Sequence, residues 1–183
     1  MSEKPHIIIT SSRFLNPVFS EYRKSHDTEG MWQSMTDEEV EQKAVLFSGL
    51  WEREKGLILG GITEALGLHF LENIICAYVV SGQQGGFSDP IVISSHLSDE
   101  KFVDVLLHEL THRLLQYHVE EINTHAITKK LFANVENPST KAHIMINAVE
   151  QYLFLEVFRD AARLQRNINY MLPYPALNLH GIS

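Results

Sequence analysis

Cysteine is almost absent from this sequence. Cys76 is the single cysteine among 183 residues, so the chain cannot form a disulfide within itself. A fold held together by a disulfide framework is therefore excluded, and this use of cysteine fits a reducing compartment. A chain of this length can instead bury an ordinary hydrophobic core, and we expect the core to stabilise the fold.

Long apolar runs are also missing. The N-terminal segment has only three consecutive isoleucines, Ile7 to Ile9, which is too short for the core of a signal peptide. No stretch approaches the roughly 20 apolar residues that are needed to cross a bilayer. We therefore expect a soluble, cytoplasmic protein without a membrane partner.

Positive charge is scarce. The chain has 15 Lys and Arg against 23 Asp and Glu, and its formal net charge is −8. Nucleic acids are held by clustered basic side chains, so we expect no nucleic-acid partner. The apolar share of 44% and the charged share of 21% are typical of globular proteins, and we expect residues 1–183 to form a single domain.

The hydrophobic pattern predicts both strands and helices. Short β-branched segments predict strands over 5–10, 73–80 and 91–95. The glycine-rich segment between the last two strands is expected to be a hairpin connection. Helical spacing and capping residues predict helices over about 16–25, 37–66, 121–133 and 138–166 and one that starts at Ser98, with a break in the second at Gly56 or at Gly60-Gly61.

The segment VDVLLHELTHRLLQYHVEE, residues 103–121, contains the motif H-E-x-x-H. Residues four apart on a helix lie on one face, so His108 and His112 can bind one metal ion. Glu109, about 100° around the helix, can reach a water beside the metal. Zinc lowers the pKa of such a water, and the glutamate takes its proton as the water attacks a carbonyl. We predict a Zn²⁺ site with Glu109 as general base; the alternative is that these residues lie on a solvated helix edge.

A catalytic zinc ion takes three protein ligands and keeps one open position. The helix expected after Pro138 has His143, Asn147 and Glu150 at i, i+4 and i+7, so three polar groups form one stripe on an apolar helix. We predict that His143 is the third ligand and that Asn147, one turn later, hydrogen-bonds a zinc histidine. The alternative is that the stripe is a solvated face.

The strand at 91–95 followed by the HELTH helix resembles the zincin metallopeptidases, and the small size resembles the minigluzincins. The resemblance covers about residues 74–158. It implies an α+β fold in which a short mixed sheet with an edge strand precedes the motif helix, with further helices after it. In this family the edge strand, here 91–95, binds an extended peptide or protein substrate by main-chain pairing. The third ligand of gluzincins is a glutamate on a later helix, so the resemblance makes Glu150 the alternative to His143.

A different branch, the metzincins, uses a third histidine at the spacing from His112 to His118. That pattern requires a glycine where this sequence has Leu115. A helix that continues past Leu115 turns His118 away from His112, so we expect His118 at the surface.

The function predicted from these residues is zinc-dependent hydrolysis of peptide bonds. A donor to the substrate oxyanion is expected among the tyrosines Tyr78, Tyr117, Tyr152, Tyr170 and Tyr174. The alternative is a protein with the same fold that binds a metal or a protein partner without catalysis. Hydrolysis of RNA by three histidines that include His118 ranks last, because it needs the same missing glycine and suits a charge of −8 poorly.

Overall fold

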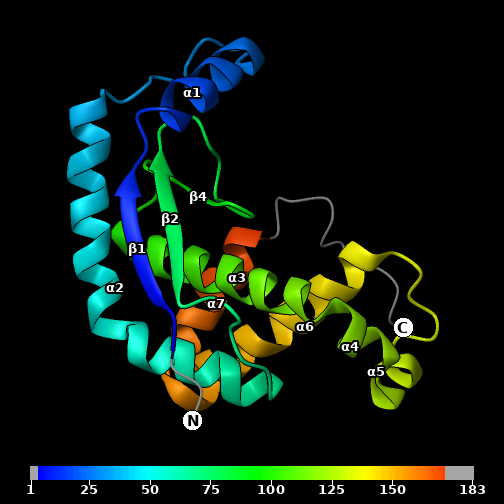
Figure 1. The fold of residues 1–183 in the computed structure, drawn as a ribbon. Coiled ribbons are helices and arrows are strands. Elements are labelled where there is room, and N and C mark those ends of the chain that lie inside the picture. Colours follow the sequence, from blue (N-terminus) through cyan, green and yellow to red (C-terminus); the bar gives the residue numbers. More distant parts are fainter. Residues whose placement is uncertain (1–3, 172–183) are drawn as a thin grey trace.

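A small sheet and a larger set of helices make up residues 4–171, the part of the chain that the computed structural model describes (Figure 1). The predicted α+β class is confirmed, with a short mixed sheet followed by helices. The elements in chain order are β1 (His6–Ser11), α1 (Leu15–His26), α2 (Asp37–Leu66), β2 (Ile74–Val80), β3 (Gly86–Ser88), β4 (Ile91–Ser94), α3 (Asp99–Tyr117), α4 (Val119–Thr124), α5 (Ala126–Leu131), α6 (Pro138–Tyr152), the π-helical turn η1 (Leu153–Val157) and α7 (Ala161–Met171).

The sheet has the strand order β1-β2-β4-β3, with β1, β2 and β4 parallel and β3 antiparallel to β4. Two predictions were wrong here. β2 and β4 are not joined as a hairpin, because parallel neighbours cannot be joined by a tight turn. The strand 91–95 is also not the edge strand, because the segment before it folds β3 onto its outer side. β3 has three residues, one of them glycine, and is too short to show an alternating pattern.

Two helices cover one face of the sheet. Ile75, Ala77 and Val79 of β2 are fully buried, whereas Ile74 remains more than half exposed, as expected of a strand with one covered face. Figure 1 shows α2 alongside β1 and α3 crossing behind the strands of the sheet. Residues from β2, β4, α2 and α3 join in one hydrophobic core, which fixes α3 under the sheet.

The long helix α2 begins as predicted and does not break. Thr36 and Glu39 form a capping box at its N-terminus, and Gly67 ends the helix in the left-handed region at φ 66°. The predicted break at the glycines was wrong, although the helix changes direction along its length (Figure 1). A Cβ on Gly61 would lie 3.0 Å from Cγ of Leu153, so this glycine allows α2 to pack closely on η1.

The C-terminal helices are shorter than predicted. The segment 121–133 divides at His125 into α4 and α5, and the segment 138–166 is interrupted by η1 and by a turn in which Arg159 has φ 56°. Asn137 caps α6, because its side chain accepts hydrogen bonds from two backbone N–H groups. No helix within residues 4–171 has the length and hydropathy needed to span a membrane.

The turn at Arg159 sends α7 back against α3. Arg163 of α7 donates to Asp104 of α3 at 2.6 Å and to Glu54 of α2 at 2.8 Å. Lys101 of α3 donates to the backbone carbonyl of Arg166 at 3.0 Å. These contacts tie α7 to the N-terminal half of α3, directly before the H-E-x-x-H motif.

Candidate metal centre

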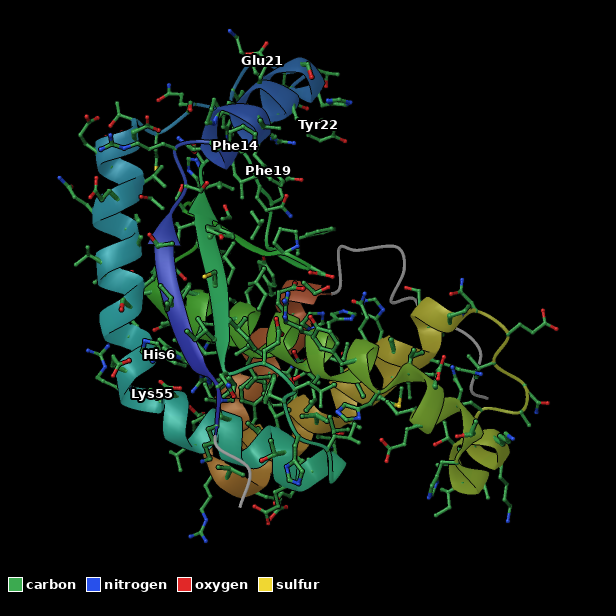
Figure 2. All side chains as sticks on the ribbon, viewed as in Figure 1. His6, Phe14, Phe19, Glu21, Tyr22 and Lys55 are labelled. Atoms are coloured by element: carbon green, nitrogen blue, oxygen red, sulfur yellow. The ribbon has the colours of Figure 1, made fainter. Side chains whose placement is uncertain are left out.

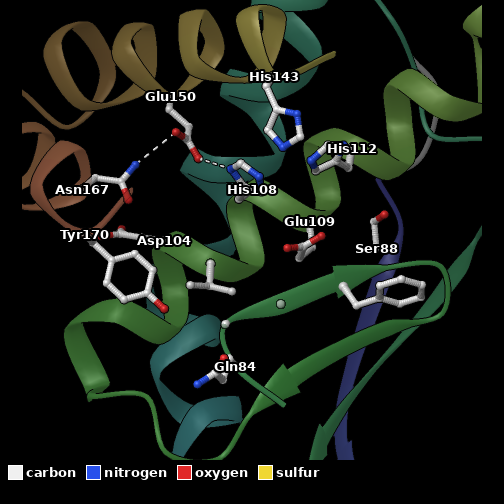
Figure 3. A pocket seen from close by; sticks show the side chains of 14 residues that line it. Gln84, Ser88, Asp104, His108, Glu109, His112, His143, Glu150, Asn167 and Tyr170 are labelled. Atoms are coloured by element: carbon white, nitrogen blue, oxygen red, sulfur yellow. Dashed lines mark hydrogen bonds and ion pairs between the residues drawn. The ribbon is translucent and has the colours of Figure 1, made fainter. Parts of the chain in front are cut away.

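Helices α3 and α6 bring three histidines together. One nitrogen each from His108, His112 and His143 lies within 4.8 Å of the others. Their ring centroids are 4.8 Å apart for His108 and His112, 4.8 Å for His112 and His143, and 5.8 Å for His108 and His143 (Figure 3). All three predicted histidine ligands therefore face one point, although His143 lies on a different helix from the motif.

Hydrogen bonds identify the nitrogens that remain available for a metal. Nδ1 of His108 lies 2.9 Å from Oε1 of Glu150, and Nδ1 of His143 lies 2.8 Å from the backbone carbonyl of Ser139. A carbonyl only accepts, so Nδ1 of His143 carries the proton, and an ionised Glu150 requires the same of His108. Nε2 of both rings then has a free lone pair, which is the arrangement found in metal-bound histidines.

The electrostatics of the three rings differ. Burial and the neighbouring imidazoles lower the pKa of His112 to about 3, so this ring is neutral at pH 7. Burial acts to lower the pKa of His108 too, but the hydrogen bond and the charge of Glu150 outweigh it and raise the pKa. Two imidazoles that are hydrogen-bonded through Nδ1, together with the neutral ring of His112, offer the nitrogen donors that zinc requires.

Glu150 supports His108. Its carboxylate is buried, and it joins His108 through Oε1 and the amide of Asn167 through Oε2, at 2.9 and 3.0 Å (Figure 3). This is the role that the sequence analysis gave to Asn147. Within the described residues Asn147 is half-buried and makes no hydrogen bond to any of the three histidines. The structure thus places the predicted alternative ligand, Glu150, behind His108.

Sequence reasoning missed Asn167. It lies on α7, 17 residues after Glu150, and is only 7% exposed. The break at Arg159 separates the two residues, so no helical periodicity connects them. The single signal in the sequence is an asparagine among long polar side chains, which does not indicate a site.

Glu109 faces the same pocket as the histidines. It is 7% exposed, and burial, opposed by His108 and assisted by Glu150, raises its pKa to about 7. No side chain or backbone N–H within residues 4–171 donates a hydrogen bond to its carboxylate. A buried carboxylate without a donor is costly, which is typical of a group kept for a reaction rather than for stability.

The histidine pocket, lined by His108, Glu109, His112, His143, Glu150, Asn167 and the strand β3, has a volume of about 350 Å³. Of the predicted oxyanion donors, Tyr170 lines this pocket; Tyr78, Tyr117 and Tyr152 do not, and Tyr174 lies outside the described residues. His118 ends α3 away from the pocket, with Nε2 2.9 Å from the carbonyl of His69.

Zinc uptake by the metal-free protein should release protons near pH 6, and His108 should supply one of them. The raised pKa of His108 keeps the ring protonated at pH 6, and binding through Nε2 must displace that proton. Calorimetric titration in two buffers of different ionisation enthalpy measures the release. The Glu109→Gln protein is used, because Glu109 itself titrates near pH 7. Glu150→Gln in that background should reduce the release at pH 7; an unchanged release would contradict the assignment.

Gly86 of β3 leaves room for Glu109. A Cβ at this position would lie 2.5 Å from Oε1 of Glu109 and 2.8 Å from Cγ1 of Val105. We therefore expect Gly86→Ala to displace the carboxylate and to slow any reaction in which Glu109 acts as a base by about 10- to 100-fold, with metal affinity unchanged. Activity assays and zinc titration check this. Gly56→Ala, which would meet no atom within 4 Å, is the matched control, and equal activity of the two variants would contradict the expectation.

Comparisons of the chain with protein-family models, with curated proteins and with solved structures give no match. We therefore infer the function from the chemistry of the site alone.

Proposed function

We propose that this protein is a zinc-dependent peptidase in which His108, His112 and His143 hold the metal and Glu109 is the general base. The observation that carries the proposal is the convergence of three metal-competent histidines and a buried glutamate in one pocket. A site for metal storage has no use for Glu109. Burial of its carboxylate costs stability, and no hydrogen bond from a described residue offsets that cost.

The donor set fits zinc. Three imidazoles, each with one nitrogen at the shared point, make the three-histidine ligand set found in catalytic zinc sites, and the pocket leaves the remaining side open. When bound, zinc lowers the pKa of a water molecule and polarises the substrate carbonyl. Glu150 and Asn167 hold His108 in the tautomer and orientation that this role requires.

The side chains of the pocket then account for the movement of protons. Glu109 accepts a proton from the attacking water and afterwards donates it to the leaving amine. Its raised pKa, about 7, makes both transfers accessible near neutral pH. Tyr170, the described tyrosine that lines the pocket, is the side chain we assign as donor to the oxyanion.

The edge strand β3 is the element that we assign to substrate binding. It borders the histidine pocket, and only one of its sides pairs with β4. The carbonyls of Gly86 and Ser88 accept hydrogen bonds from Gln83 and Arg113, both at 3.2 Å, which fixes the strand in position. Each carbonyl retains a second lone pair, so an extended peptide can still add to this edge.

Incubation of untagged protein with a mixed peptide library tests the proposal. Mass spectrometry should detect repeated cleavage that requires zinc, stops with a chelator and is absent from Glu109→Gln prepared in the same way. Equal cleavage by wild type and Glu109→Gln would show a contaminating protease. Zinc binding without any cleavage would replace the peptidase with a metal-binding protein.

A further inference from the structure

A second pocket opens beside the histidine pocket. Gln84, Gly85 and Tyr170 line both, and the second pocket has a volume of about 390 Å³. Its other walls include Arg23 and Trp32. No carboxylate is among the described residues that line it. We call it the Arg23 pocket, after the residue that gives it its charge.

Arg23 lacks the partners that the structure gives to other arginines. Arg113 and Arg163 each pair with two carboxylates, whereas Arg23 forms no ion pair with any residue between 4 and 171. When the side-chain amide of Gln84 is oriented with its oxygen toward Arg23, the orientation that satisfies both groups, this oxygen accepts from both terminal nitrogens of Arg23, at 3.0 and 3.2 Å. Nε of Arg23 is buried and has no hydrogen-bond partner among the described residues. Since a guanidinium has five N–H donors, more than half of them remain unused.

The helix that carries Arg23 is fixed in place. Buried Asn16 accepts from the backbone N–H of Ser81 at 2.8 Å and donates to Asp37 at 2.7 Å. A Cβ on Gly82 would overlap the backbone of Phe19, so α1 lies directly on the segment that follows β2. Figure 2 labels Phe19 on this helix, at the end of the sheet. The guanidinium is therefore held at the pocket by a rigid element.

We propose that the Arg23 pocket binds a carboxylate of the peptide substrate, on the C-terminal side of the cleaved bond. This inference rests on the proposed peptidase function. A guanidinium with unused donors matches the planar geometry of a carboxylate. Its positive charge attracts an anionic group, although the chain as a whole has a net charge of −8. The carboxylate belongs either to the C-terminus of the peptide or to an acidic side chain.

The strand direction decides which side of the cleaved bond reaches Arg23. Gln84 and Gly85 precede β3, so the Arg23 pocket lies at the N-terminal end of that strand. A peptide that adds to β3 in antiparallel orientation, the commoner pairing, has its C-terminal part at that end. Cleavage beside the three histidines then leaves the C-terminal portion of the substrate next to Arg23.

Cleavage of matched peptides tests the inference. A library of acetylated octapeptides is supplied with a C-terminal carboxylate or a C-terminal amide, and the cleaved bonds are mapped by mass spectrometry. We expect kcat/KM to be about 10- to 100-fold higher when a carboxylate stands at a fixed place after the cleaved bond. Loss of the preference on amidation identifies the C-terminus as its source, whereas loss on Glu to Gln exchange identifies a side chain.

Variants assign the preference to Arg23. Arg23→Gln should cleave the acid and amide forms at nearly equal rates, and Arg23→Lys should retain part of the preference, because it keeps the charge without the planar fork. Lys24→Gln removes the same charge from an exposed neighbour and should leave the preference unchanged. Zinc content and circular dichroism verify that each variant folds. A preference that survives in Arg23→Gln, or intact cleavage with no preference in wild type, overturns the inference.

Binding provides a readout that does not depend on turnover. Glu109→Gln protein is titrated with dye-labelled acid and amide forms of one peptide by fluorescence polarisation. The acid form should bind about tenfold more tightly, and the additional change Arg23→Gln should remove the difference. Absence of zinc-dependent cleavage would refute the peptidase, while equal binding of the two forms to Glu109→Gln would refute the Arg23 site.

Discussion

Glu109→Gln is expected to lower kcat/KM by roughly 10²- to 10⁴-fold, the contribution usual for a general base, while the protein keeps its zinc. Glutamine has nearly the same shape as glutamate but cannot accept the proton of the attacking water. Glu109 lines the same pocket as the three histidines, but it is not one of the residues whose ligand atoms could hold a metal ion together. Steady-state kinetics on a cleaved peptide, together with zinc content per chain, measure both effects.

Glu120→Gln is the matched control for this change, because Glu120 is an exposed glutamate outside the histidine pocket. It should leave both the rate and the zinc content unchanged. A Glu109→Gln protein that loses zinc in parallel with its activity would contradict the general-base role, because the glutamate would then act through metal binding.

His143→Ala is expected to lower zinc affinity by more than 100-fold. Removal of a residue that supports a ligand costs about 10- to 100-fold, and removal of a ligand itself should cost more. His143 approaches from a different helix, so its loss leaves two histidines on α3 that cannot complete a three-ligand site by themselves. Competition with a chromophoric chelator measures the affinity.

Two other variants on α6 provide zinc affinities with which that of His143→Ala can be compared. Asn147→Ala, one turn from His143, should change zinc affinity little, because Asn147 makes no hydrogen bond to the three histidines within the described chain. Glu150→Gln should weaken binding by about 10- to 100-fold through His108. A larger loss in Glu150→Gln than in His143→Ala would contradict the ligand assignment and favour Glu150 as the third ligand.

The grouping of the histidines could be predicted because helical geometry is local. His108 and His112 are one turn apart, and the stripe on α6 contained the third histidine. The support of His108 by Glu150, which was predicted as the alternative ligand, in place of Asn147 was harder to predict. Seven residues advance a helix by about 700°, closer to whole turns than the 400° of four residues, so Glu150 aligns better with His143. Which of the two reaches α3 depends on how the helices cross.

Long-range pairing explains what the sequence did not reveal. Asn167 and Arg23 reach their pockets only because α7 reverses at Arg159 and α1 packs against the segment after β2. The edge strand β3 depends on pairing with β4 rather than on its own three residues. Such long-range contacts produce no periodic pattern in the sequence, whereas amphipathic helices and β-branched strands do.

The zinc-edge X-ray absorption spectrum of the untagged, zinc-loaded protein shows whether the three histidines bind the metal, because it counts the imidazole ligands of the bound zinc. We expect about one zinc ion per chain, with three imidazoles supplied by His108, His112 and His143, and the loss of one imidazole in any zinc that His143→Ala retains. A protein that takes up no zinc, or a spectrum with two imidazoles and a carboxylate from Glu150, would contradict it.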